Sequence, residues 1–162
     1  PIVWNTNSYE EVETIKKLKN YVDIYLADLK FVASELSENF AAAKDYFEKA
    51  SQAILQMRKN QPKDIVENGL MKKGIIVRHL VMPTYQEDSK KVLNWINDNL
   101  SNQTYISLMS QYTPCFKAKE PINRKLKPLE YKIVLKECEK LGFVNGFTQE
   151  FESASTKYIP NF

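Results

Sequence analysis

The stretch VDIYLADLK, residues 22–30, decides the fold class. It is mostly apolar and rich in β-branched and aromatic residues, and a short run of this kind is typical of a strand inside a sheet. The same stretch ends with Asp28 and Lys30, two opposite charges two residues apart. We therefore predict a buried strand whose carboxyl end carries charged side chains.

Strands and helices alternate on both sides of this strand. IVW (2–4) is a predicted strand, and Ser8 and Glu11 in SYEE have the spacing of a helix capping box, so we expect a helix over 9–19. Helical spacing of apolar residues predicts further helices over 34–59 (one or two), 86–99 and 129–142, the last capped by Gly142. Asn68-Gly69 predicts a hairpin, and strands are expected over 74–82, 104–109 and near 143–147.

This alternation predicts an α/β fold with parallel strands joined by right-handed crossovers. A complete (β/α) barrel needs about 250 residues. A chain of 162 residues therefore predicts a partial TIM-type barrel or an open sheet, in one domain over residues 1–162 with 146–162 as a tail. Because the sequence begins with Pro1 and enters an apolar run at once, we expect the N-terminal strands of the barrel to be missing from this chain.

Composition restricts the classes of partner. The formal net charge of +3 arises from 23 basic and 20 acidic side chains without a block of like charges, which points to neither nucleic acid nor a membrane surface. No apolar stretch approaches a membrane span or the core of a signal peptide, so we expect a cytoplasmic protein. Cys115 and Cys138 lack the spacing of a metal site, and we expect both to be free thiols.

Polar side chains collect where the predicted parallel strands end. The carboxyl ends of parallel strands meet at one rim of a sheet or barrel, which is where such folds bind ligands. The rim residues, strand by strand, are Asn5, Thr6 and Asn7; Asp28 and Lys30; Arg78 and His79; and Ser110, Gln111 and Tyr112. We predict that these side chains form a binding site.

Side-chain alternation within the strands predicts which of these side chains share one face of the sheet. Asp28 and Lys30 share parity with Ile24 and Leu26, so an unbroken strand would point both charges to one face, where they could pair or share a ligand. Arg78 lies well inside its strand, and a buried guanidinium is costly without an anionic partner. That partner is either Asp28 or a carboxylate or phosphate of a ligand.

Structural explanations remain open for each of these residues. Asp28, Lys30 and Arg78 could form ordinary ion pairs. His79 has the opposite parity to Arg78 and is expected to pack against a helix. The remaining rim residues are also good turn or cap residues: Asn5, Thr6 and Asn7 after the first strand, and Gln111 and Tyr112 before TPC.

Four segments occur in an order that resembles a known family. WNTN, VDIYLADLK, GIIVRHLVMP and ISLMSQYTPC, with helices between them, are similar to radical S-adenosylmethionine proteins of the pyruvate formate-lyase activating enzyme type, closest to the activating-enzyme-related branch. The resemblance covers residues 2 to about 146. It implies a partial (β/α)6 barrel that binds S-adenosylmethionine and a 4Fe-4S cluster, and cleaves the former to a 5′-deoxyadenosyl radical.

Two elements of the family pattern are absent from this sequence. It has neither the CxxxCxxC cluster-binding loop nor the Gly-Gly-Glu motif that follows a second strand, and both would lie upstream of Pro1. The chain thus resembles the C-terminal two-thirds of such an enzyme. The resemblance implies that this chain supplies cofactor-binding residues but no cluster ligand and no catalytic residue, and that it is inactive alone.

The family's cofactor contacts transfer one residue at a time. Thr6 and Asn7 match an Asp-Thr-Asn motif in which Asn5 replaces the aspartate; Asp28 and Lys30 match its DLK; Arg78 matches an arginine facing the carboxylate of S-adenosylmethionine; and Gln111 or Tyr112 stands where the family has a histidine. The implied binding set is Asn5, Thr6, Asn7, Asp28, Lys30, Arg78, Gln111 and Tyr112.

The resemblance also suggests partners. It implies a glycyl-radical enzyme, or another protein or peptide, as the substrate of the radical. If upstream strands are absent, the IVW strand becomes an apolar edge that could pair with another copy. Two alternatives stay open: a non-catalytic α/β domain that binds an anionic metabolite at the same rim, and a scaffold whose rim charges neutralise one another.

Overall fold

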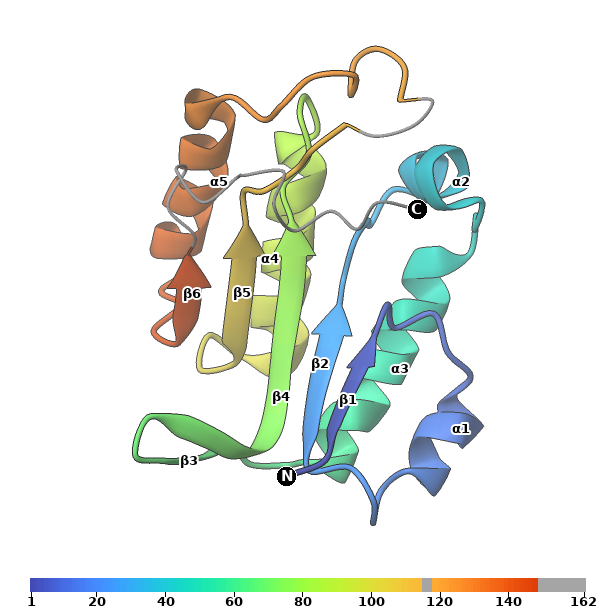
Figure 1. Ribbon diagram of the computed structural model, residues 1–162, viewed down its shortest axis with the longest axis vertical. Coiled ribbons are helices and arrows are strands. Elements are labelled where there is room, and N and C mark those ends of the chain that lie inside the picture. The colour runs from blue at the N-terminus through green and yellow to red at the C-terminus, as the bar shows by residue number, and fades with distance from the viewer. Residues whose placement is uncertain (115–117, 149–162) are drawn as a thin grey trace.

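The computed structural model describes residues 1–114 and 118–148, in which strands and helices alternate along the chain (Figure 1). The strands are β1 (Val3–Thr6), β2 (Ile24–Asp28), β3 (Ile65–Glu67), β4 (Leu70–Leu80), β5 (Tyr105–Met109) and β6 (Gly146–Thr148). The helices are α1 (Val12–Lys17), α2 (Ser34–Ala41), α3 (Tyr46–Asn60), α4 (Gln86–Leu100) and α5 (Pro128–Lys140).

Five of these strands form one open parallel sheet in the order β1-β2-β4-β5-β6, and β3 pairs antiparallel with the start of β4. The predicted α/β class with parallel strands is confirmed, and the open sheet is consistent with a partial barrel. The C-terminal tail proposed from the sequence lies outside the described residues except for 146–148, which pair with β5. None of the described helices is long and apolar enough to cross a bilayer.

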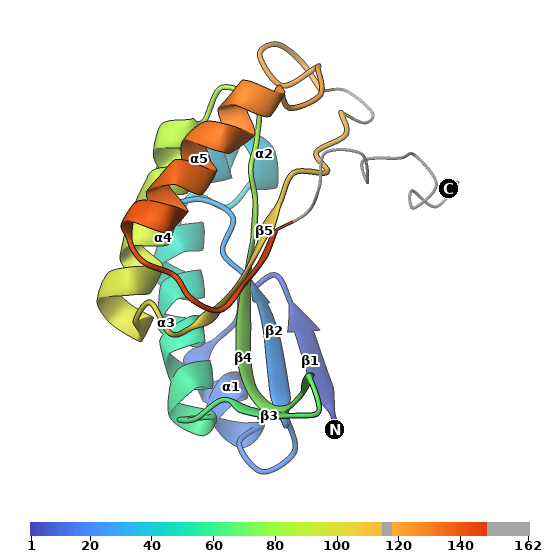
Figure 2. The ribbon, with the colours of Figure 1, turned by 90° about the vertical axis from the view of Figure 1, so that its left-hand side faces the viewer.

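The helices cover one face of the sheet, and this determines which side chains can form a site (Figure 2). Alternate residues of β2 and β4 are buried beneath the helices, among them Tyr25, Ala27, Ile75 and Val77. Burial of a side chain such as Ile75 or Val77 contributes roughly 1.5–3 kcal/mol. The residues between them point to the opposite face, hereafter the open face. It carries Leu26, Asp28, Ile76, Arg78 and Ser107.

The predicted turn and cap residues have mixed outcomes. Asn68 and Gly69 both have positive φ (52° and 76°), as a two-residue hairpin turn requires, so the hairpin is confirmed. Gly142 follows α5 with φ 72°, as expected of a helix C-terminus. The capping box at Ser8 is wrong. Ser8 has φ 65° and lies in a turn after β1, and α1 begins only at Val12, with Glu11 as the preceding residue.

Strand β1 is an edge of the sheet within the described residues. Two apolar side chains at its start are well exposed, Ile2 at 59% and Val3 at 50%. An exposed apolar edge strand is a template for pairing with another chain. Self-association through the first strand therefore stays a prediction.

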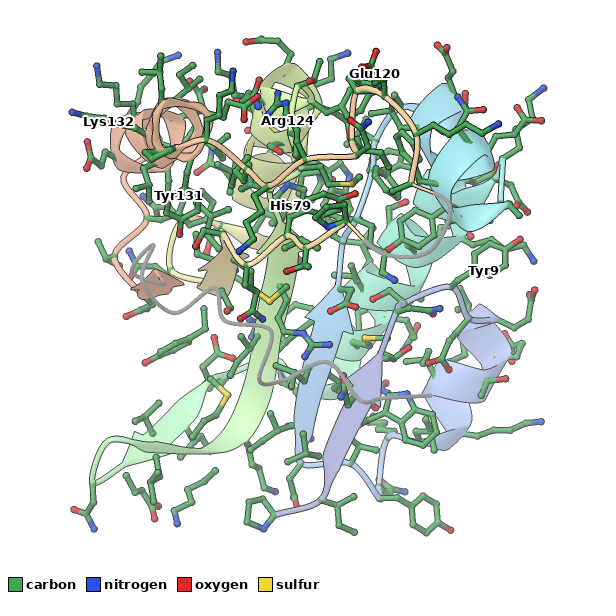
Figure 3. The ribbon with its side chains drawn as sticks, turned by 45° about the horizontal axis from the view of Figure 1, so that its top comes forward. Tyr9, His79, Glu120, Arg124, Tyr131 and Lys132 are labelled. Atoms are coloured by element: carbon green, nitrogen blue, oxygen red, sulfur yellow. The ribbon has the colours of Figure 1, made fainter. Side chains whose placement is uncertain are left out.

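A partly exposed carboxylate, that of Glu130, links the loop before α5 to the loop after β4. Glu130 accepts two 2.8 Å hydrogen bonds from Arg124, and it also accepts from the backbone N–H groups of Thr84 (2.9 Å) and Lys127 (2.8 Å). Figure 3 places Arg124 above the carboxyl ends of the strands. These donors, Arg124 first, lower the pKa of Glu130 from 4.5 to about 2.

Replacement of Glu130 by Gln is expected to reduce the decrease in unfolding free energy that the wild type shows as the pH falls below about 4.5. Because the pKa of Glu130 is lowered in the folded state, its contribution is complete above about pH 4.5 and is lost as the pH falls toward 2. Arg124 is 34% exposed and solvent screens the pair, so we expect a loss of about 1–2 kcal/mol near pH 7. Urea unfolding across this pH range measures the difference. A gap between Glu130→Gln and wild type that stays constant down to pH 2 would contradict the assignment.

Candidate functional site

Three side chains converge on the open face near the carboxyl ends of β1, β2 and β4. Arg78 donates from Nε to Oδ1 of Asp28 at 2.7 Å and from Nη2 to Oδ1 of Asn5 at 2.7 Å. Asp28 and Arg78 are direct neighbours in the register of β2 and β4. We refer to Asn5, Asp28 and Arg78 as the rim cluster.

The rim cluster is only partly shielded from solvent. The side chains of Arg78 and Asp28 are 23% and 19% exposed, and Nη2 of Arg78 lies 2.7 Å from Oδ1 of Asp28. The anionic partner that the sequence required for Arg78 is therefore Asp28. Among the described residues, Arg78 donates from Nε and Nη2, and no hydrogen bond starts from Nη1.

Lys30 lies two residues beyond Asp28 but outside the strand, since β2 ends at Asp28. The described residues include no ion pair between Asp28 and Lys30, so of the two possibilities, pairing and sharing a ligand, the structure does not show the first. The physical reason is that Asp28 is already bound by Arg78 on the neighbouring strand. The segment 28–30 thus brings one neutralised carboxylate to the rim and carries a further positive charge, on Lys30, just beyond the strand.

Thr6 and Asn7 serve the turn that follows β1. The hydroxyl of Thr6 donates to Glu10 and accepts from the N–H of Ser8 at 2.9 Å. The side-chain oxygen of Asn7 accepts from the N–H of Tyr9 at 3.0 Å. These contacts confirm the turn alternative for both residues. Any contact with a cofactor remains a prediction for them.

The carboxyl end of β5 contributes a different set of contacts. Tyr112 donates from its hydroxyl to the backbone oxygen of Ile122 at 2.8 Å, which ties the end of this strand to the following loop. Gln111 is exposed, and the hydroxyl of Ser110 is buried without a hydrogen-bond partner among the described residues. Cys115 lies outside the described residues. The cofactor roles proposed for Gln111 and Tyr112 stay predictions.

His79 points away from the rim cluster, into the layer between sheet and helices. Nδ1 lies 2.8 Å from the backbone oxygen of Leu29 and Nε2 lies 2.9 Å from Oγ of Ser89. The carbonyl can only accept, so Nδ1 carries the proton and Nε2 accepts from Ser89. Burial lowers the pKa of His79 and keeps the ring neutral. The prediction of a packing histidine is confirmed.

Tyr46, the first residue of α3, is a rim residue that sequence reasoning missed. Its hydroxyl bonds to the backbone of Asn7, Asp28 and Lys30, at distances of 2.9 Å to 3.1 Å. Burial raises the pKa of this hydroxyl. The sequence offered no signal for this contact, because the pattern of an amphipathic helix predicts only that its first tyrosine packs in the core.

The chain's own residues fit the two implied cofactors differently. A 4Fe-4S cluster requires several thiolates, and the sequence contains two cysteines, of which Cys138 lies on α5 with its pKa raised by burial. No group of three or more metal-ligating side chains occurs among the described residues. This chain does not fit the cluster. An anionic group on a small molecule fits better, since Nη1 of Arg78 has no hydrogen-bond partner among the described residues.

The geometry defines an α/β protein with an open parallel sheet and a polar cluster at the carboxyl ends of three adjacent strands. No family model matches the sequence. The chain is 36% identical over 143 residues to an uncharacterised protein of Methanocaldococcus jannaschii, and this match covers 86% of the chain. It covers 38% of the relative, so the chain spans less than two fifths of that protein's length.

The fold has a counterpart among solved structures. It is similar to the crystal structure of a domain of pyruvate-formate lyase-activating enzyme from Bacteroides vulgatus, with a TM-score of 0.65. The match covers 91% of this chain and 80% of that domain at 10% sequence identity. At this identity the comparison shows a shared fold.

Proposed function

We propose that this chain is the S-adenosylmethionine-binding part of a radical S-adenosylmethionine enzyme resembling the pyruvate formate-lyase activating enzyme. The observation that supports it most is the rim cluster, in which Asn5 and Asp28 hold two nitrogens of a guanidinium and no described residue bonds the third. It lies at the carboxyl ends of parallel strands, where such folds bind ligands. The fold shared with a domain of an activating enzyme adds to this support.

The groups of S-adenosylmethionine suit the side chains at the rim. Its carboxylate would bind Nη1 of Arg78 and the ammonium of Lys30, because charge-assisted hydrogen bonds to a carboxylate are about twice as strong as neutral ones. Asn5 and Asp28 hold the guanidinium in one orientation, so little further ordering is needed on binding. Half-buried apolar side chains of the open face, Ile76 and Leu80, offer a surface to the adenine.

Reductive cleavage of S-adenosylmethionine requires a 4Fe-4S cluster, and the residues of this chain do not fit one. A cluster, in the protein made from the complete gene, would be held by residues other than those described, and this chain would bind and orient the cofactor beside it. A glycyl-radical enzyme or another protein is the proposed substrate.

A second candidate function follows from the charge of the site. Arg78 and Lys30 bring two positive charges to the rim and Asp28 brings one negative charge, so the net charge favours an anion. A non-catalytic domain that binds an anionic metabolite would use the same side chains.

The two candidates are separated by one assay on the product of the complete gene, purified without oxygen. Iron and sulfide analysis and formation of 5′-deoxyadenosine from S-adenosylmethionine under reducing conditions are measured together. We expect cleavage that falls by at least about tenfold in Lys30→Ala, since a charge-assisted bond contributes roughly 1.5–3 kcal/mol. Lys132→Ala is the control, because Lys132 projects from α5 away from the sheet (Figure 3). A protein without iron and without cleavage would contradict the enzyme and leave the anion-binding domain.

A further inference from the structure

The hydroxyl of Tyr46 lies between two strand ends that both carry site residues. It donates to the backbone oxygen of Asn7 (2.9 Å) or of Asp28 (3.1 Å), and it accepts from the N–H of Lys30 (3.1 Å). A hydroxyl has one hydrogen to give and two lone pairs to receive, so this set uses both functions. Tyr46 therefore joins the segment after β1 to the segment after β2.

This contact begins where regular strand pairing ends. The ladder between β1 and β2 stops at the pair Thr6 and Ala27. Beyond it, the N–H of Lys30 reaches the carbonyl of Asn7 through the hydroxyl of Tyr46. The side chain thus takes the place of a direct ladder bond and fixes the spacing of two backbone segments that have left the sheet.

Tyr46 is itself held firmly enough to set that spacing. Its side chain is buried, with 2% of the residue exposed. The ring stacks on Tyr9 with centroids 6.1 Å apart and meets Phe31 edge-on at 6.3 Å. Such aromatic pairs contribute beyond their area burial, and a tyrosine has only two side-chain torsions to fix. Because burial raises its pKa, the hydroxyl keeps its proton and can donate at neutral pH.

We propose that Tyr46 is a positioning residue of the rim, which holds the ends of β1 and β2 so that Asn5 and Asp28 both reach Arg78. Asn5 lies two residues before the carbonyl that Tyr46 binds, and Asp28 supplies the second carbonyl. Without the hydroxyl, the segments beyond the last ladder pair lose the link between them, and the strand ends that carry Asn5 and Asp28 hold the guanidinium less firmly. The consequence for ligand affinity rests on the proposed function, whereas the consequence for Arg78 does not.

The test compares two tyrosine-to-phenylalanine variants of the full chain. Tyr46→Phe removes the hydroxyl at the first residue of α3. Tyr25→Phe is the matched control, because the hydroxyl of Tyr25 is also buried and accepts a 2.8 Å hydrogen bond from Asn60, the last residue of the same helix. Both variants lose a buried hydroxyl at opposite ends of α3: Tyr46→Phe loses one donated and one accepted hydrogen bond, and Tyr25→Phe loses the one accepted from Asn60. Thermal unfolding, the Kd for S-adenosylmethionine and the NMR signal of the Arg78 Nε–H are measured for each.

We expect a decrease in Tm for both variants, larger for Tyr46→Phe, and an effect on the rim for Tyr46→Phe alone. Tyr46→Phe should weaken S-adenosylmethionine binding by about fivefold, the worth of one typical hydrogen bond, and should shift the Arg78 Nε–H signal and speed its exchange with water. Tyr25→Phe should leave Kd and the Arg78 signal unchanged.

Two results would overturn the positioning role: an unaltered Arg78 signal in Tyr46→Phe, or equal changes in both variants. The Arg78 signal does not depend on a ligand. If the wild-type chain fails to bind S-adenosylmethionine while Tyr46→Phe still alters that signal, the positioning role stands and the proposed function fails.

Discussion

Replacement of Arg78 by Gln is expected to weaken binding of S-adenosylmethionine to the full chain by about 30- to 100-fold. The change removes a charge-assisted hydrogen bond to the ligand carboxylate, worth roughly 2–3 kcal/mol. Arg78→Lys keeps the charge but loses the planar fork that Asn5 and Asp28 hold, and should cost about tenfold. Isothermal titration calorimetry measures both.

The matched control is Arg124→Gln. Arg124 is also bound in a two-pronged contact to a carboxylate, that of Glu130, but it belongs to the loop before α5 and lies outside the rim cluster. Its replacement should lower stability and leave the Kd unchanged. Wild-type affinity in Arg78→Gln would exclude this residue from the ligand site.

Loss of Arg78 also leaves the carboxylate of Asp28 without its partner, which destabilises the fold by itself. The double variant Arg78→Gln/Asp28→Asn separates the two effects, because it removes the unpaired charge. We expect the double variant to recover stability and not affinity. Recovery of both would favour the scaffold in which rim charges merely neutralise each other.

Replacement of Gly74 by Ala is expected to destabilise the fold by about 3 kcal/mol or more, the range of severe backbone and packing conflicts. Gly74 has φ 138°, which side chains rarely adopt, and an added Cβ would lie 2.3 Å from Oδ1 of Asp64. That oxygen accepts 3.0 Å hydrogen bonds from Arg58 and from the N–H of Ile75. The extra atom must therefore displace a bound carboxylate at the start of the parallel part of β4.

Gly69→Ala is the control for backbone strain alone. Gly69 also has positive φ, 76°, but an added Cβ meets nothing within 4 Å, so the expected loss is about 1 kcal/mol. Urea unfolding of both variants gives the comparison. Equal losses would show that crowding against Asp64 contributes nothing.

The parts of the fold that were predictable from sequence depend on local pattern. Alternation in β4 placed Arg78 and His79 on opposite faces, and the structure confirms both positions, because a strand's period of two leaves no other choice. Asn68-Gly69 predicted the hairpin because few other dipeptides tolerate two positive φ angles.

The parts that were not predictable depend on contacts distant in sequence. The capping box at Ser8 failed because the Thr6 hydroxyl binds the N–H of Ser8 and forms a turn instead. Tyr46 and Glu130 act on loops 16 to 46 residues away, which no local pattern reveals. The rim cluster itself was partly predictable, since a charged residue inside a strand requires a partner, but the choice of Asp28 over a ligand required the structure.

Whether the rim cluster binds the cofactor can be tested by titrating the isotope-labelled chain with S-adenosylmethionine and following the side chains of Arg78 and Lys30 by NMR. We expect saturable shifts of the Arg78 Nη and Nε signals and of the Lys30 side chain, with the signals of Arg58 and Arg124 unchanged. Saturable binding that leaves Arg78 and Lys30 unchanged, or no binding, would contradict the assignment of the rim cluster as the cofactor site.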